Sequence, residues 1–300
     1  MLWIPITVFA ALAQTIRNAA QRHLVTELGT LGATLVRFLY GLPFALLWLG
    51  AAASAARASL PAPTLAFLGW CLAGGLAQIV GTALLLATMR ERNFAVGVAY
   101  SKTEVVQVAL LSFVLLGDRL TAGSALAVAA GTLGVLLLAP ADRERPFASL
   151  VEGLASKSAL MGLGCGAGMA MSAVSYRAAT QVAGTPSWIV NAALTVAVAQ
   201  FMQTLILGGW LLWRSPEVVT RTLRAWRASL FAGFMGAAAS IAWFTAFAIQ
   251  SVTYVRTLGL VEMPMSYLVS RRIFRERLTP REIAGMALIG AGAALIVTLA

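Results

Sequence analysis

The chain is a succession of long apolar segments separated by short polar connections. Because an open sheet leaves backbone groups unsatisfied in lipid, apolar runs of about 17 to 25 residues predict membrane-spanning helices. The fold class that we expect is therefore an all-α integral membrane protein. Its ten predicted spans cover residues 3–21, 31–53, 64–89, 94–117, 121–139, 158–178, 187–212, 228–250, 252–273 and 280–299.

The predicted spans fall into two groups of five. Glu104 precedes Asp118-Arg119-Leu120-Thr121 by the same interval at which Glu262 precedes Glu276-Arg277-Leu278-Thr279, at a constant register of 158 residues. A second register, of 155 residues, relates Arg22, Gly29 and Thr30 to Arg177, Gly184 and Thr185. Because each group has an odd number of spans, the second copy would enter the membrane from the opposite side, which is the inverted repeat of many transporters. We expect one repeat at 1–140, a connecting loop at 141–157 and the inverted repeat at 158–300.

Composition and charge narrow the class further. Charged residues make up 11% of the chain, against about 25% in soluble domains. Lys and Arg gather in the odd-numbered connections, whereas the even-numbered ones hold Arg57, Arg119 and Arg177. Positive charge marks cytoplasmic loops, so this asymmetry predicts that both termini lie outside. The apolar run at the start has no basic segment before it, so we expect the first span to be retained.

Several classes of function are disfavoured by the same composition. The net charge of +11 is scattered over short loops, which predicts no nucleic-acid partner. Cys71 and Cys165 lie in apolar segments and His23 is the only histidine, so we expect no disulfide framework, no metal and no cofactor. Motifs for hydrolysis or for ATP binding are missing from the sequence, so we expect neither an enzyme nor direct ATP drive.

Two charges lie near the middle of the fourth predicted span, where each costs roughly 3 kcal/mol or more. Glu104 stands about ten residues, or ~15 Å, from the start of this span. Helical spacing places Tyr100 and Gln107 on its face and directs Lys102 elsewhere. Glu104 could bind an amine or take up a proton in a cavity, and the alternative is a structural partner for Lys102, Arg17 or Arg256. Lys102 could balance an anionic substrate group, Glu104 or Glu262.

Glu262 occupies the matching position of the second half and is followed by Pro264. Proline lacks the backbone N–H and crowds the carbonyl of Leu260, so the helix is expected to kink or open beside the carboxylate. An opened helix at this depth would leave carbonyl groups free for a ligand. The alternative is a kink that serves packing, with Glu262 held in a structural pair.

Polar and aromatic side chains on other spans are further candidates for substrate binding. Gln14, Arg17, Asn18 and Gln21 form one stripe on the first span, although Arg17 could instead reach the membrane interface. Rings within the spans could contact cationic or apolar substrates, or could serve packing and the interface belt. Gln78, Tyr176 and Trp243 complete the candidates on the third, sixth and eighth spans.

These features together resemble the drug/metabolite transporter superfamily, in its ten-helix, EamA-like branch of bacterial metabolite exporters. The residues that carry the resemblance are Arg37-Phe38, Gly117-Asp118-Arg119-Leu120-Thr121, Gly131, Gly134, Glu262-Met263-Pro264, Glu276-Arg277-Leu278-Thr279, Gly290 and Gly292. The resemblance implies that spans 1, 3, 4, 6, 8 and 9 surround a central cavity. It also implies transport of small metabolites, with both termini inside, whereas the loop charges here predict the reverse.

The leading hypothesis is a secondary transporter that exports small polar metabolites, amino acids first, by alternating access. A zwitterion needs an anionic and a cationic partner, which Glu104 or Glu262 and Lys102 or Arg17 would supply. Protonation of one glutamate could couple export to the proton gradient, and downhill exit is the alternative. The runner-up is efflux of organic cations such as quaternary amines. The expected partners are the substrate, protons and the lipid bilayer, with the protein a monomer or homodimer.

Overall fold

The structure is a computed structural model that describes residues 2–107, 129–130, 133–134, 137–138, 156–250 and 252–298. Over these residues the chain is helical and contains no strand. The helices are α1 (Trp3–Leu39), α2 (Leu42–Ala56), α3 (Leu65–Glu91), α4 (Phe94–Ser101), α8 (Lys157–Val182), α9 (Trp188–Arg214), α10 (Pro216–Arg224), α11 (Trp226–Ile249), α12 (Val252–Leu258), α13 (Glu262–Arg272) and α14 (Pro280–Thr298). Most of the predicted span 121–139 lies outside the described residues, as do the motif at 117–121 and the connection at 141–155.

Five stretches of the described chain are long and apolar enough to cross a membrane, at Trp3–Ala56, Leu65–Glu91, Lys157–Val182, Trp188–Arg214 and Trp226–Ile249. The helices α3, α8, α9 and α11 match predicted spans to within a few residues. The first two spans differ from the prediction: helix continues beyond residue 21 to residue 28, and the second span is interrupted at Tyr40–Gly41 between α1 and α2. The protein is thus an all-helical, multi-pass membrane protein.

Helix α1 changes direction at Gly29, where the backbone leaves the helical region (φ 71°, ψ 171°). Glycine reaches this region without steric cost because it has no Cβ. The two arms of α1 are then joined by a hydrogen bond from Gln21 Nε2 to the carbonyl oxygen of Ala33 (2.7 Å). The bend therefore brings residues before and after Gly29 together in the interior.

We expect Gly29→Ala to destabilise the protein by about 1–3 kcal/mol through backbone strain alone. A Cβ at this position would meet no atom within 4 Å, so side-chain crowding contributes nothing. Gly50→Ala is the matched control, because Gly50 is also uncrowded but lies inside a regular helix. Thermal unfolding in detergent measures both variants, and equal midpoints would contradict the role given to Gly29.

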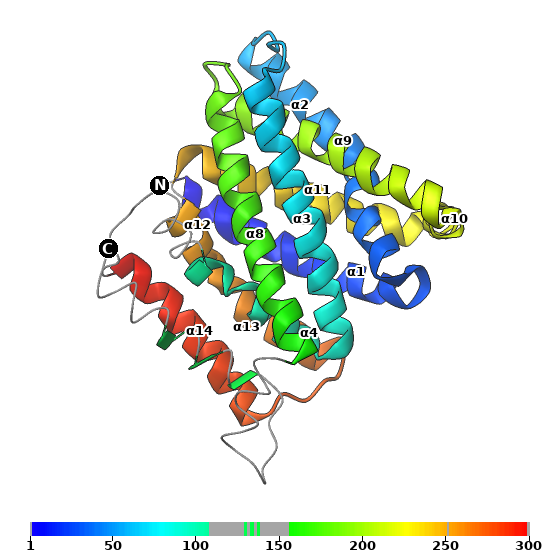
Figure 1. Cartoon of the computed structure of the whole chain (residues 1–300). Coiled ribbons are helices and arrows are strands. Elements are labelled where there is room, and N and C mark those ends of the chain that lie inside the picture. The colour runs from blue at the N-terminus through cyan, green and yellow to red at the C-terminus, as the bar shows by residue number, and fades with distance from the viewer. Residues whose placement is uncertain are drawn as a thin grey trace.

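Two helix pairs form the centre of the bundle. Helix α1 packs along α11, and α3 packs along α8 (Figure 1), while α2 contacts α9. The buried faces are rich in small side chains, as in the apolar cluster that includes Ala10, Ala173, Ala239 and Ala246. Small residues let helix backbones approach closely in a membrane. The first span thus packs on the eighth, and the third on the sixth.

Contacts between connections agree with the predicted grouping of the odd-numbered ones. Arg22 pairs with Glu276, Arg92 Nη2 lies 3.0 Å from Glu282 Oε1, and Lys157 Nζ lies 2.7 Å from Glu91 Oε1. These pairs join the first connection to the ninth, the third connection to the start of α14, and the fifth connection to the third. The Arg-rich connections therefore gather at one end of the bundle, which we call the basic end.

Two of the predicted spans are broken at equivalent positions. Helix α4 ends at Ser101, a turn occupies Lys102 and Thr103, and helix resumes at Glu104. In the second half α12 ends at Leu258, a 3₁₀ segment covers Gly259–Val261, and α13 begins at Glu262. Each glutamate thus opens the second piece of a broken helix.

Candidate functional site

Lys102 connects the two glutamates in the interior. Its Nζ pairs with Glu262 Oε2 and lies 3.9 Å from Glu104 Oε1. The side chains of all three residues are at most 2% exposed. The expectation that Lys102 would point away from Glu104 was wrong, because it assumed a continuous helix, whereas the turn at Lys102–Thr103 alters the direction of these side chains.

The polar stripe of α1 completes the environment of Glu262. Gln14 Nε2 donates to Glu262 Oε2 (2.7 Å), and Asn18 Nδ2 donates to Glu262 Oε1 (3.0 Å). Arg17 Nη2 donates to Asn18 Oδ1 (2.6 Å) rather than to the carboxylate itself. Trp243 Nε1 in turn donates to Gln14 Oε1 (3.0 Å). Glu262, which belongs to the second half of the chain, therefore accepts from side chains of the first half.

Glu104 has a second cation beside it. Arg256 Nη1 lies 3.4 Å from Glu104 Oε1, and its guanidinium stands over the rings of Trp243 (4.8 Å) and Phe247 (5.1 Å). Within the described residues, Glu104 Oε2 has no hydrogen-bond partner. Both carboxylate oxygens of Glu262 thus have partners, whereas in the described part of the chain only Oε1 of Glu104 has them.

These residues form a buried charge network, which we define as Lys102, Glu104, Arg256, Glu262 and the amides of Gln14 and Asn18. Burying one ion in an apolar interior costs several kcal/mol, and pairing returns this cost only where geometry is good. Removing one partner leaves an unpaired buried charge, at a cost of about 3–5 kcal/mol. The network can therefore persist in a membrane only while its charges stay balanced.

Tyr100 and Gln107 lie against α8. A Cβ at Gly162 would collide with the Tyr100 ring, and one at Gly166 would lie 2.7 Å from Gln107 Nε2. Gln107 Nε2 donates to Thr103 Oγ1 (3.0 Å) and to the carbonyl oxygen of Leu163 (3.1 Å). The two residues thus fix the broken fourth span on α8.

Gln78 and Tyr176 belong to a separate buried cluster with Gln203. Tyr176 OH donates to Gln78 Oε1 (3.3 Å), and Gln203 Nε2 donates to the same oxygen (2.9 Å). The Tyr176 ring lies 4.3 Å from the ring of Phe244, which joins this cluster to the aromatic residues around Trp243. Tyr254, by contrast, is 43% exposed and does not join the buried rings.

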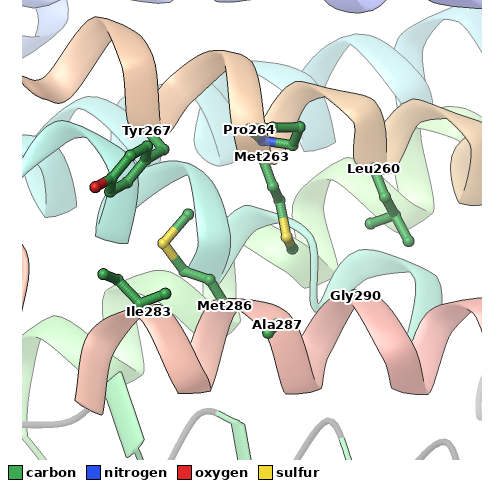
Figure 2. A pocket seen from close by; sticks show the side chains of 8 residues that line it. All are labelled: Leu260, Met263, Pro264, Tyr267, Ile283, Met286, Ala287 and Gly290. Carbon is green, nitrogen blue, oxygen red and sulfur yellow. The ribbon is translucent and has the colours of Figure 1, made fainter. Parts of the chain in front are cut away.

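Pro264 lies in the first turn of α13, next to the interrupted segment 259–261. It lines an apolar groove of about 560 Å³ between α13 and α14. In Figure 2 Met263, Pro264 and Tyr267 lie above Ile283 and Met286 across this groove. The groove offers no charged group, so it is not part of the charge network.

Contacts around Arg22 join several helices at the basic end. Its guanidinium pairs with Glu276 and stands 4.3 Å from the Phe274 ring centre, which stacks on Phe94 (5.3 Å). Glu276 Oε2 also accepts from the backbone N–H of Phe94 (2.9 Å) and from Ser270 Oγ (2.5 Å). These contacts join α1, α4 and the end of α13.

Some of these residues were not singled out as site residues by the sequence. Arg256 was named only as a structural partner for Glu104. Arg22 was used only to define a repeat register. Phe247 was one of several rings without a distinguishing pattern. A charged residue that recurs at the equivalent position of the other half could have served as a signal. Arg22 has such a counterpart in Arg177, whereas Arg256 has none.

Comparison with known proteins supports the transporter interpretation. Residues 156–298 match the EamA-like transporter family. A solved protein crystal structure superposes with a TM-score of 0.57 at 19% identity, over 99% of this chain and 99% of the other, which indicates a shared fold. No curated protein matches the chain. Residues 156–298 therefore form a domain of the EamA-like transporter family, which indicates a membrane transporter of small molecules.

Proposed function

We propose that this protein is a secondary transporter that exports small polar metabolites, with amino acids as the leading class, by alternating access. The observation that carries this proposal is the buried charge network between the two broken helices. Intramembrane ionisable groups that face a bundle interior mark substrate and ion pathways. A zwitterion would exchange its ammonium and carboxylate groups for partners within the network.

The proposal includes ten helices in two inverted repeats, at 1–140 and 158–300. Three observations support it: Gly29 and Gly184 both have positive φ, the fourth and ninth spans break at equivalent residues, and α1 packs on α11 as α8 packs on α3. All three are expected if the halves are related by a two-fold axis in the membrane plane.

Alternating access requires the basic end to open and close. The contacts of Arg22 with Glu276 and Phe274 hold this end closed, with the charge network buried. In the proposed orientation both termini lie outside the inner membrane and the basic end faces the cytoplasm. Substrate would then enter after the contacts around Arg22 separate.

Glu104 is the carboxylate that we propose for proton coupling. Its Oε2 has no hydrogen-bond partner among the described residues, whereas Glu262 accepts three donors. A proton on Glu104 would leave Arg256 free to turn toward a substrate. Downhill exit without protons is the alternative mechanism.

Efflux of organic cations remains the second candidate, and one contact favours it. The guanidinium of Arg256 already lies over Trp243 and Phe247, so these rings can hold a cation within the interior. A quaternary amine could take this place if Arg256 turned away. The cation would then bind without using Lys102.

Counterflow in proteoliposomes tests the proposed function. We expect unlabelled substrate inside the vesicles to drive transient uptake of the same labelled compound, with a rate that saturates. Amino acids, organic anions and quaternary amines form the panel, each measured at two pH values. Saturable counterflow of any member supports a carrier, and uptake without counterflow or saturation would overturn it in favour of a passive pore.

A further inference from the structure

Among the residues that the structure describes, more cationic than acidic side chains are buried in the interior. Arg17, Arg37, Lys102 and Arg256 are 1%, 3%, 2% and 6% exposed, and the acids that lie among them are Glu104 and Glu262, at 2% and 0%. Lys102 pairs with Glu262, and Arg256 pairs with Glu104. Among the described residues, neither Arg17 nor Arg37 forms an ion pair with an acidic side chain.

The bend at Gly29 places these two arginines on either side of one small residue. A Cβ at Gly236 of α11 would lie 3.3 Å from Arg17 Cδ and 3.3 Å from Arg37 Cγ. Both aliphatic stems therefore pass over Gly236, although the two arginines are twenty residues apart in sequence. The absence of a side chain at Gly236 gives both stems room.

The guanidinium groups keep unused donors in this buried place. Arg17 donates through Nη2 to Asn18, whereas its Nε and Nη1 have no hydrogen-bond partner within the described part of the chain. Arg37 Nη1 donates to Thr82 Oγ1 (2.9 Å), and its Nε is likewise without a partner there. Buried donors, and charged ones above all, are normally satisfied. Unused donors on two cations are suited to a bound oxyanion, because guanidinium groups bind carboxylate and phosphate oxygens through several hydrogen bonds.

We propose that Arg17 and Arg37 form an oxyanion subsite, so that the transported compound is a small organic anion with net negative charge. This inference rests on the proposed function and deepens it: an acidic amino acid, a dicarboxylate or a phosphate monoester fits the subsite better than a neutral zwitterion or a quaternary amine. The substrate's oxyanion supplies the charge that the protein interior lacks. A second polar group of the substrate then lies near Asn18, which links Arg17 to Glu262 of the charge network.

Binding and counterflow of four probes test the subsite: succinate, glycerol 3-phosphate, alanine and tetramethylammonium, at fixed ionic strength. We expect one of the two anions to raise the unfolding midpoint of the detergent-solubilised protein and to show counterflow. Arg37→Met and Arg17→Met should each raise the half-saturating concentration of that anion about tenfold or more. Arg37→Lys, which keeps the positive charge, should raise this half-saturating concentration less. Exposed Arg224 on α10 supplies the control, and Arg224→Met should bind the anion as the wild type does.

The outcomes separate this inference from the function on which it rests. Counterflow of alanine or tetramethylammonium alone, unchanged in the folded arginine variants, would overturn the subsite and leave the carrier intact. Stabilisation by an anion without counterflow of any probe would uphold the subsite but reject the carrier. Should Arg17→Met fail to fold, Arg37→Lys and Arg37→Met still decide, because their anion affinities differ only if Arg37 binds the anion. Succinate and glycerol 3-phosphate distinguish a carboxylate from a phosphate.

Discussion

Replacing Lys102 with Met is expected to abolish counterflow of a substrate that carries a carboxylate and to lower the free energy of unfolding by about 3–5 kcal/mol. Lys102 Nζ pairs with Glu262 and lies 3.9 Å from Glu104, so the variant leaves two buried carboxylates with one nearby partner fewer. Denaturation in detergent and counterflow in liposomes give the two effects separately. Flux of a quaternary amine should be largely spared, since a cation does not need Lys102.

Lys102→Met combined with Glu262→Gln separates structure from transport. The double variant removes one charge of each sign, so most of the lost stability should return, because coupled residues give non-additive effects. Transport should remain absent, because the substrate still lacks its partners. Full recovery of transport in the double variant would contradict a functional role for the pair. Unchanged carboxylate flux in Lys102→Met would reject the zwitterion or anion assignment.

Gly166→Val is expected to separate α8 from the broken fourth span and to abolish transport. A Cβ at Gly166 would lie 2.7 Å from Gln107 Nε2 and 3.2 Å from the backbone nitrogen of Glu104, and it would collide with Thr103 Oγ1. The larger side chain must displace Glu104 from Lys102 and Arg256. Overpacking of this kind costs about 1–3 kcal/mol, which thermal unfolding measures, and counterflow measures the loss of function.

Gly164→Ala is the matched control on the same helix. Its Cβ would approach only Leu84 Cδ1, at 3.0 Å, and the end of a leucine side chain can move. We expect this variant to retain counterflow. Equal loss of transport in Gly164→Ala and Gly166→Val would show that α8 tolerates no added atoms. The effect of Gly166→Val could then not be assigned to its contact with Glu104.

Much of the fold follows from the sequence because its causes are local. Apolar length and short polar connections predicted membrane helices, and α3, α8, α9 and α11 lie close to the predicted bounds. The bend at Gly29 was not predicted, since an isolated glycine between two apolar runs is equally compatible with an ordinary loop. Its consequence, the approach of Arg17 to Arg37, depends on packing against Gly236.

The centre of the candidate site could be predicted from the sequence for a different reason. Repetition at a fixed register singled out Glu104 and Glu262 without any knowledge of contacts. The break at Lys102–Thr103 carries no such signal, because it contains neither proline nor glycine. The sequence also does not predict which cation pairs with which carboxylate, as with Arg256 and Glu104. The pairing depends on the relative positions of helices that lie far apart in sequence.

Labelling of the native thiol at Cys165 tests most directly whether the charge network lies on an alternating pathway. Cys165 is buried on α8 next to Gly166, where an added Cβ would meet Thr103 and the backbone nitrogen of Glu104. With Cys71 replaced by Ala, it is the sole cysteine of the chain. We predict that a small membrane-impermeant thiol reagent modifies Cys165 in transporting vesicles, and that saturating substrate slows the modification. A transporting protein whose Cys165 is never modified from either side would contradict the account.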